Sequence, residues 1–335
     1  MSSEQPKSDL RVVTIGGGTG SFTLLSVLKE YFNDLTAIVT MSDNGGSTGQ
    51  LRDELGVLPP GDTRQCLVAL SESPKVRDLF NYRFDEGSLA GHSFGNLFLT
   101  ALEKMTGSFA EAVETASEVL NVQGQVIPAT LDNVQLNLAW PDHNVVLEGE
   151  EVIDVEALPY DPRQAILSLE PAAQANPAAL AAIATADLVV IAPGDLYTSL
   201  GAVLVADGFR EVLETTKAKV VYICNLVTKK GHTDGFDVAA HAAEIERFIG
   251  APVIDVVFYD DTQPPDDLLE KYAKKGEFWV QTNVETLKNQ HYQAIGGNFI
   301  ASANDTPLAK GDLLAAHRTF IRHDADAVAK KLLEL

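Results

Sequence analysis

The 335-residue sequence is poor in cysteine and in long apolar runs. Its two cysteines, Cys66 and Cys224, each lie inside an apolar stretch and have no zinc-site spacing, so we expect buried free thiols in a reducing, cytoplasmic compartment. No apolar run approaches the roughly 20 residues of a membrane span. The first ten residues, MSSEQPKSDL, are polar and lack the apolar core of a signal peptide. We predict a disordered tail over residues 1–10.

Positive charge is also scarce. The chain has 25 Lys and Arg against 47 Asp and Glu, which leaves a formal net charge of −22. A surface this acidic repels nucleic acid and anionic lipid, so we expect neither as a partner. An anionic ligand therefore needs a local pocket made of backbone N–H groups and a few cations.

Common catalytic motifs are missing. The sequence has no G-x-S-x-G nucleophile elbow, no H-E-x-x-H motif and no Cys/His/Asp cluster at metal-ligand spacing. We therefore predict no catalytic residue, no resident metal and no required cofactor.

What is present is an alternation of short apolar runs and segments with helical spacing. Residues 11–15, 21–32 and 35–41 predict a strand, a helix and a strand, and their right-handed crossover implies a parallel sheet. Residues 50–121 have a helical pattern. In this stretch and beyond it we predict helices at 64–72, 75–84, 93–106, 109–120, 177–186, 196–216, 238–249, 265–274 and 324–335.

The hydrophobic period changes in the middle of the chain. Residues 125–130, 134–140 and 145–155 alternate apolar and polar side chains, which predicts an antiparallel β insertion at about 122–160. Further strands are predicted at 165–169, 187–192, 220–226, 253–258, 278–281 and 293–300. The simplest architecture is a single Rossmann-like, doubly wound α/β domain over 11–335, with a mostly parallel sheet.

Two glycine-rich loops follow the first two predicted strands. Ligands of an open parallel sheet bind at the carboxyl ends of strands. GGGTGS at 16–21 leads into a helix, where free N–H groups attract phosphate, although it is neither a Walker A loop nor a complete dinucleotide fingerprint. In SDNGG at 42–46, Asp43 can accept hydrogen bonds from ribose or bind Mg²⁺ through oxygen. The alternatives are a plain tight turn and an Asx turn.

Polar residues also follow the later strands and open the helices. Asp62 is either a site residue or a helix N-cap, and Arg64 can pair with it or reach a phosphate. Gly95 and Asn96 indicate close backbone approach and an amide that contacts the ligand. PGDLYTS at 193–199 offers hydroxyls at a helix start. Asn225 and Thr228 follow the next strand, and Lys229-Lys230 is either ordinary surface charge or a counter-charge for phosphate.

These motifs, in this order, resemble the gluconeogenesis-factor (YvcK-like) family. The resemblance rests on GGGTGS, SDNGGSTGQLR, PPGDTRQCLVAL, YRF, GHSFGNL, PGDLYTS and CNLVT between residues 12 and 233, with RHD at 322–324. The chain is similar, more distantly, to the 2-phospho-L-lactate transferases (CofD-like) that build coenzyme F420. The resemblance implies a Rossmann-like fold, binding of a UDP-sugar such as UDP-N-acetylglucosamine, and a role in cell morphogenesis and wall synthesis during gluconeogenic growth.

From the residues and the resemblance together we predict a regulator that binds a nucleotide sugar. We favour this regulatory role over an enzymatic one. It would act with cell-wall synthesis proteins and form a homo-oligomer. The alternative is a 2-phospho-L-lactate-type transferase with a nucleotide-activated donor and a deazaflavin acceptor, which needs Mg²⁺ on Asp43 and Asp62. A third hypothesis, an NAD(P)-dependent oxidoreductase, is supported only by the first glycine-rich loop, and we rank it last. The predicted ligand-contacting residues are Gly16, Gly17, Gly18, Thr19, Gly20, Asp43, Asn44, Gly45, Gly46, Asp62, Arg64, Gly95, Asn96, Gly194, Tyr197, Thr198, Ser199, Asn225, Thr228 and Arg322.

The chain departs from the family's pattern at three positions. Asn44 stands where the family usually has a second Asp, which weakens a two-carboxylate metal site. Asp195 replaces a Ser and is expected to bring negative charge towards a phosphate. His232 replaces a Glu in a later loop.

Overall fold

A seven-stranded parallel sheet forms the centre of the computed structural model, which describes residues 6–154, 157–301 and 321–335. In spatial order its strands are β10 (Gln293–Gly297), β9 (Val256–Asp260), β8 (Lys219–Ile223), β7 (Leu188–Ile191), β1 (Ser8–Gly16), β2 (Phe32–Val39) and β3 (Gln125–Pro128). Every neighbouring pair in this sheet is parallel. The predicted Rossmann-like, mostly parallel fold is confirmed.

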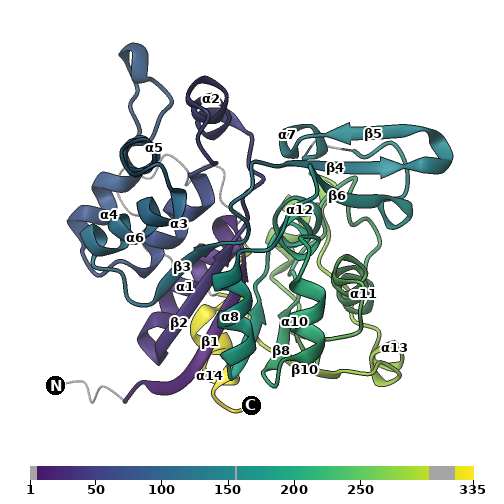
Figure 1. Ribbon diagram of the computed structural model, residues 1–335. Helices are drawn as coiled ribbons and strands as arrows, with labels where there is room; N and C mark the ends of the chain where they lie inside the picture. The colour runs from purple at the N-terminus through teal and green to yellow at the C-terminus, as the bar shows by residue number, and fades with distance from the viewer. Residues whose placement is uncertain (1–5, 155–156, 302–320) are drawn as a thin grey trace.

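A small antiparallel sheet stands beside the large one, at the upper right of Figure 1. Its strands are β5 (Val145–Glu148), β4 (Gln135–Trp140) and β6 (Ile166–Glu170), in that order. The alternating burial of β4 turns Leu136, Leu138 and Trp140 inward. Their burial joins the small sheet to the main hydrophobic core.

The direction of winding reverses at β1. The chain passes from β1 to β2 and β3 on one side and later enters β7 on the other side. Ile15 of β1 pairs with Ile38 of β2 and with Ile191 of β7, so the carboxyl ends of these strands lie side by side. Such a switch point is where doubly wound proteins form their ligand crevice.

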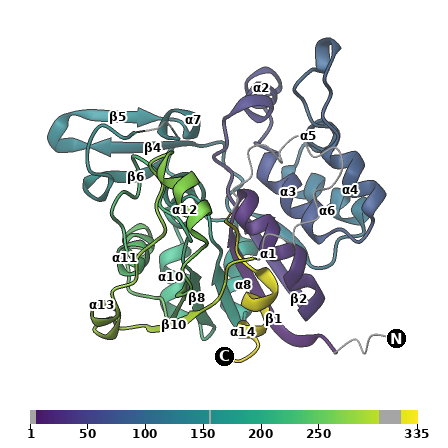
Figure 2. The ribbon, with the colours of Figure 1, turned by 180° about the vertical axis from the view of Figure 1, so that it is seen from behind.

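Helices cover both faces of the large sheet (Figures 1 and 2). Because successive strand residues face opposite sides, Val12 packs with the helices of one face and Val13 with those of the other. The first face carries α1 (Gly18–Tyr31), α3 (Gly61–Leu70), α5 (Phe94–Thr106), α6 (Phe109–Leu120) and α14 (Ala325–Leu332). The second carries α8 (Pro177–Thr185), α9 (Ala202–Leu204), α10 (Phe209–Thr215) and α11 (Val238–Ile249).

Five further α-helices belong to the described part of the chain. They are α2 (Gly46–Leu55), α4 (Pro74–Asn81), α7 (Glu150–Ile153), α12 (Asp266–Ala273) and α13 (Val284–Lys288). Within the described ranges, none of the protein's helices combines the length and the apolar character that crossing a bilayer requires.

Two strands were assigned to the wrong sheet. The segment predicted at 125–130 as part of the antiparallel insertion is β3, which pairs in parallel with β2. The segment predicted at 165–169 as a return to the large sheet is β6, which pairs antiparallel with β4. The antiparallel unit therefore spans 135–170 rather than about 122–160. Alternation within a strand reports which side chains are buried, and it carries no information on the partner strand.

Several element boundaries also differ from the prediction. Strand β1 already begins at Ser8, so residues 8–10 are not a tail, and residues 1–5 lie outside the described residues. The segment predicted as a strand at 145–155 ends at Glu148 and continues as α7. The long helix predicted at 196–216 is interrupted at Gly208, whose φ of +106° is left-handed.

Two further segments take a different form from the one predicted. The loop after β2 turns into α2 already at Gly46. The predicted strand at 278–281 makes only isolated bridges, from Trp279 to Val227 and from Gln281 to Asp237. The segment at 278–281 is too short for hydrophobic periodicity to separate a strand from a loop.

Candidate functional site

A cavity of about 330 Å³ opens at the carboxyl ends of β1, β7 and β8. Its walls are the loop after β1, the loop after β7, the segment after β8 and the residues just before α14. It brings together eight of the predicted ligand residues, namely Gly17, Gly18, Thr19, Gly20, Gly194, Ser199, Asn225 and Arg322. Loops that are distant in sequence thus meet in one cavity at the switch point.

The glycines of the first loop allow close contacts between loops. A Cβ atom on Gly20 would lie 2.1 Å from the carbonyl oxygen of Pro193, so only glycine fits where the loops after β1 and β7 touch. Gly18 has a left-handed φ of +69°, and no atom lies within 4 Å of its Cβ position. Its backbone is therefore open to a ligand in the cavity.

Two polar side chains tie the strand ends together. Asn225 Nδ2 donates to the Gly194 carbonyl at 2.7 Å, and Asn225 Oδ1 accepts from the Gly194 N–H at 3.4 Å. His323 Nε2 lies 3.0 Å from the carbonyl oxygen of Cys224. Burial lowers the pKa of His323 to about 4, so the ring is neutral at pH 7 and donates to this carbonyl.

Asp195 is neutralised by protein groups. Its Oδ1 accepts the N–H groups of Tyr197 and Thr198, both at 3.0 Å, and its Oδ2 lies 2.6 Å from Lys229 Nζ. Burial alone would raise the pKa of Asp195, but the charge of Lys229 and these hydrogen bonds hold the pKa below its ordinary value. Lys229 also pairs with Asp154. The predicted counter-charge for phosphate thus serves Asp195 instead.

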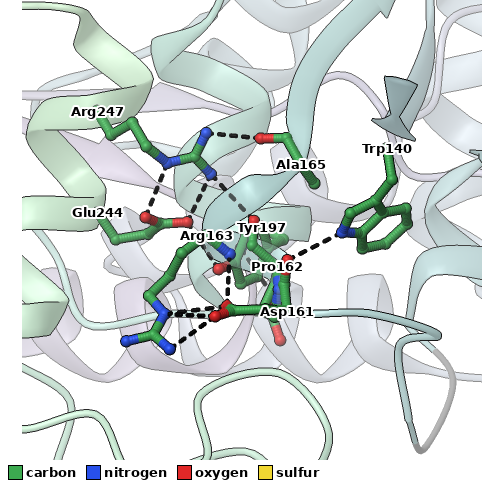
Figure 3. A network of polar contacts seen from close by, with 9 residues as sticks. Trp140, Asp161, Pro162, Arg163, Ala165, Tyr197, Glu244 and Arg247 are labelled. Atoms are coloured by element: carbon green, nitrogen blue, oxygen red, sulfur yellow. Dashed lines mark hydrogen bonds and ion pairs between the residues drawn. The ribbon is translucent and has the colours of Figure 1, made fainter. Parts of the chain in front are cut away.

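Tyr197, Thr198 and Thr228 lie outside the walls of this cavity. Tyr197 is fully buried, and its hydroxyl donates to Glu244 Oε1 at 2.7 Å (Figure 3). Thr198 is buried beside it, and Thr228 Oγ1 accepts from the Phe278 N–H at 2.9 Å. The sequence does not show which hydroxyl side chains at a strand end face the ligand cavity, because packing sets the direction of each side chain.

A second group of predicted residues forms a carboxylate cluster behind the first loop. A Cβ atom on Gly17 would lie 2.3 Å from Asp62 Oδ2, and one on Gly61 would lie 2.6 Å from Asp43 Oδ2. Asp62 also accepts the Gly18 N–H. The two aspartates therefore adjoin the loop that lines the cavity.

Glu150 is a third member of this cluster that sequence reasoning missed. It begins α7 on the small sheet and is hydrogen-bonded to Asp43. The strand predicted at 145–155 includes Glu150. The preceding Gly149, with a φ of +94°, was the signal that the strand ends there.

The cluster concentrates negative charge in a buried place. Burial, assisted by the charge of Asp43, raises the pKa of Asp62 to about 7. Burial and the charges of Asp43 and Asp62 raise the pKa of Glu150 to about 9. Across the described residues, no group of three or more His, Cys, Asp and Glu is placed to hold a metal ion. Mg²⁺, however, commonly uses one or two carboxylates together with substrate phosphates, and Asp43 and Asp62 offer such donors.

Four more predicted residues have structural contacts outside the cavity walls. Arg64 is buried, with Nε 3.0 Å from Asn96 Oδ1 and Nη1 2.5 Å from Asn81 Oδ1. Gly95 makes room for it, because a Cβ atom there would lie 2.7 Å from Arg64 Cδ. Asn44 Oδ1 accepts the Glu151 N–H at 2.8 Å and so joins the loop after β2 to α7.

The last three predicted residues lie at element ends. Gly16 ends β1, and Gly45 and Gly46 begin α2. None of the three lines the cavity.

We expect Asp62→Asn to stabilise the fold at alkaline pH. The folded state raises the pKa of Asp62 from 3.8 to about 7, so it binds the proton more tightly than the unfolded chain and loses stability as pH rises from about 4 to about 7. Asparagine removes this loss and should raise the free energy of unfolding by about 2–4 kcal/mol at pH 8, with little change at pH 4. Urea unfolding at both pH values measures it.

The matched control is Asp53→Asn, because the Asp53 side chain is 71% exposed. It should leave the free energy of unfolding nearly unchanged at both pH values. If the free energy of unfolding of Asp62→Asn depends on pH as that of the wild type does, ionisation of the buried Asp62 carboxyl is not what destabilises the fold at alkaline pH.

Known proteins share both this sequence and this fold. Residues 12–300 match the family described as 2-phospho-L-lactate transferase CofD. The gluconeogenesis factors of Bacillus subtilis and Listeria innocua are each 38% identical, over 97% of this chain and 98% and 95% of theirs. A crystal structure of a UPF0052-family protein from Bacillus halodurans superposes with a TM-score of 0.86 at 35% identity, covering 98% of this chain and all of that one. The chain therefore belongs to the gluconeogenesis-factor family, within the wider CofD family.

Proposed function

We propose that this protein binds a nucleotide sugar of the UDP-N-acetylglucosamine class in the cavity at the β1/β7 switch point. In this proposal it acts in the cytoplasm as a regulator of cell-wall synthesis and cell shape during gluconeogenic growth. The observation that carries the proposal is the meeting of residues 17–20, 193–195, 225–227 and 321–323 with Ser199 around one cavity. The printed name of its relatives, gluconeogenesis factor, supports the physiological part.

The chemistry of the cavity suits a pyrophosphate group. The first N–H groups of α1 have no partner within the helix, and they form the positive end of its dipole. Arg322 is the only Lys or Arg among the described lining residues. Because Asp195 is already paired with Lys229, its negative charge is compensated before an anion enters. A volume near 330 Å³ lies within the range of small-molecule sites.

The lining residues support binding rather than turnover. The neutral His323 ring is committed to a main-chain carbonyl, and Asp195 is ion-paired and caps the helical segment that follows it. The Nε2–H of His323 and the carboxylate of Asp195 are therefore engaged by the protein itself. A ligand held there can stabilise one arrangement of the three loops, which is what a sensor needs.

We expect UDP-N-acetylglucosamine to raise the melting temperature of the wild type by several degrees. Ligand at one hundred times its Kd adds about 2.7 kcal/mol to the free energy of unfolding. Arg322→Met removes the cationic side chain of the cavity and should weaken binding at least about tenfold, since hydrogen bonds to charged groups contribute about 1.5–3 kcal/mol. Thermal-shift titration measures both effects. Lys288→Met, whose side chain is 64% exposed, is the matched control and should bind like the wild type.

The second candidate is transfer of a 2-phospho-L-lactate-type group to a deazaflavin acceptor. The match to the CofD family and the position of Asp43 and Asp62 beside the first loop favour it. Mg²⁺ on these carboxylates would supply charge stabilisation at the bridging phosphate. Incubation with Mg²⁺, the nucleotide-activated donor and a deazaflavin separates the two candidates. A Mg²⁺-dependent product would contradict the regulator, and an unmoved melting temperature with UDP-N-acetylglucosamine would contradict nucleotide-sugar binding.

A further inference from the structure

A second cavity, of about 390 Å³, lies along the same edge of the large sheet and shares no lining residue with the first. Gln263 comes from the loop after β9, and α12 supplies Leu269, Glu270 and Ala273. Phe278, Trp279 and Gln281 come from the segment that follows α12. We call this set the aromatic pocket. Because its first member follows the carboxyl end of β9, the pocket belongs to the edge where parallel sheets bind ligands.

Main-chain hydrogen bonds fix the position of residues 278–281, which supply Phe278, Trp279 and Gln281 to the aromatic pocket. The Val280 N–H donates to the Leu226 carbonyl at 3.0 Å, and the Thr228 N–H donates to the Phe278 carbonyl at 2.7 Å. Leu226 and Val227 belong to the wall of the first cavity. The residues after β8 therefore separate the two cavities, and the side chains of the aromatic pocket are presented by a fixed main chain. Such pre-organisation lowers the entropy cost of binding.

The surface of the pocket is apolar and aromatic in a very acidic protein. Phe278 is 55% exposed, and Trp279 beside it is partly exposed. Leu269 and Ala273 complete the apolar part. Large exposed aromatic side chains that gather at a hollow mark a contact site, because their burial against a ligand is favourable.

The polar residues of the pocket select the ligand. The amide nitrogens of Gln263 and Gln281 each donate one hydrogen bond within the chain, to Asp266 Oδ1 and to the Trp279 carbonyl. The second N–H and the oxygen of each amide can contact a ligand, and Glu270 accepts. The described lining residues include no Lys, Arg or His, so a phosphate finds no counter-charge there. A pyranose ring matches this set, since its C–H face packs on an aromatic ring while its hydroxyls both donate and accept. We propose that the aromatic pocket is a binding site for a neutral sugar ring.

Intrinsic fluorescence tests this site directly, because the chain has two tryptophans and only one is in the pocket. Trp140 is 1% exposed and bonded through Nε1 to the Asp161 carbonyl, so a ligand-dependent change in emission reports on Trp279. Titration of the wild type with N-acetylglucosamine or maltose should change the emission saturably and protect Trp279 from acrylamide. Glycerol, a polyol without a ring, should not.

Variants of the two amides connect the signal to the pocket. Gln263→Ala and Gln281→Ala should each weaken sugar binding about fivefold, the loss expected for a neutral hydrogen bond. Gln290→Ala, an amide at the end of α13 that lines neither cavity, is the matched control and should bind like the wild type. A cooperative thermal unfolding transition close to that of the wild type shows that each variant is folded.

Three results would overturn the sugar site. They are a wild type without a saturable response, amide variants that bind as the wild type does, and a saturable response to choline but not to sugars. Saturation-transfer NMR with N-acetylglucosamine on the wild type is a second measurement, and an absence of transfer would count against the site. The proposed function fails by a different measurement, an unmoved melting temperature with UDP-N-acetylglucosamine, so the two failures are distinguishable.

Discussion

Arg247→Ala should lower the free energy of unfolding by about 3–5 kcal/mol, because it leaves the Glu244 carboxylate buried without a counter-charge. The Glu244 side chain is 4% exposed. Arg247 Nη2 lies 2.6 Å from Glu244 Oε1, and Arg247 Nε lies 2.9 Å from Oε2 (Figure 3). The Tyr197 hydroxyl is the other donor to this carboxylate. Urea unfolding at pH 7 measures the loss.

The same network offers a matched control. Arg163 pairs with Asp161 at 2.7 Å, but the Arg163 side chain is 60% exposed, so water screens the pair. Arg163→Ala should cost at most about 1 kcal/mol. If Arg247→Ala and Arg163→Ala lower the free energy of unfolding equally, burial does not determine how much each ion pair contributes to stability.

The Arg247 network also bears on the ligand site. Arg247 Nη1 donates to the carbonyl of Ala165, the residue just before β6, at 2.7 Å. Tyr197 donates to Glu244, the partner of Arg247, and it follows two residues after Asp195, which lines the cavity. One guanidinium thus joins the small sheet to the helical segment after β7. We therefore expect Arg247→Ala to reduce the thermal shift caused by UDP-N-acetylglucosamine as well. A reduced shift in Tyr197→Phe, which keeps the ring and loses the hydroxyl, would locate the effect in this contact.

Gly20→Ala should abolish the thermal shift caused by UDP-N-acetylglucosamine and destabilise the fold by about 3 kcal/mol. The added Cβ would lie 2.1 Å from the Pro193 carbonyl oxygen, which is main chain and cannot rotate away. The loops after β1 and β7 must therefore move apart, and both of them line the same cavity. Thermal-shift titration measures the loss of binding, and urea unfolding measures the loss of stability.

Gly18→Ala separates this clash from ordinary backbone strain. Gly18 has a left-handed φ of +69°, but its Cβ position meets no atom within 4 Å. Alanine there should cost only about 1–2 kcal/mol, the penalty of the left-handed conformation. A Gly20→Ala variant that is no less stable than Gly18→Ala and still binds the nucleotide sugar would show that contact between the loops does not shape the cavity.

The carboxylate cluster illustrates how a site can oppose stability. Asp43, Asp62 and Glu150 come from three separate elements and repel one another in a buried place, which raises the pKa of Asp62 and of Glu150. A core selected only for stability would not gather them. A gain in stability for Asp62→Asn at alkaline pH would support the proposal that this cluster is a functional site, because such sites commonly cost stability.

The order of strands and helices was predictable from local pattern, and so was the position of the first glycine loop. Apolar runs such as residues 12–15 and 188–192 are buried on both faces, which is typical of parallel strands. A loop at the end of such a strand lies at the ligand edge by geometry alone. These inferences need no knowledge of distant contacts.

Sheet membership and side-chain direction were not predictable in this way. The strands β3 and β6 look alike in the sequence, yet one pairs with β2 and the other with β4. Glu150 reaches Asp43 only because the small sheet packs against the large one. The contact of Glu150 with Asp43 joins residues more than a hundred positions apart, and hydrophobic periodicity describes only neighbours along the chain.

By itself, the sequence determined the alternation of elements, the parallel sheet and the glycine turns at its edge, because backbone preference and hydrophobic period act over a few residues. The tertiary structure alone decided which polar groups line the cavity. Ser199 and Asn225 face it, whereas Tyr197 is turned to a buried carboxylate. The physical reason is that a side chain's direction depends on the partner that packing brings to it, and that partner comes from a distant part of the chain.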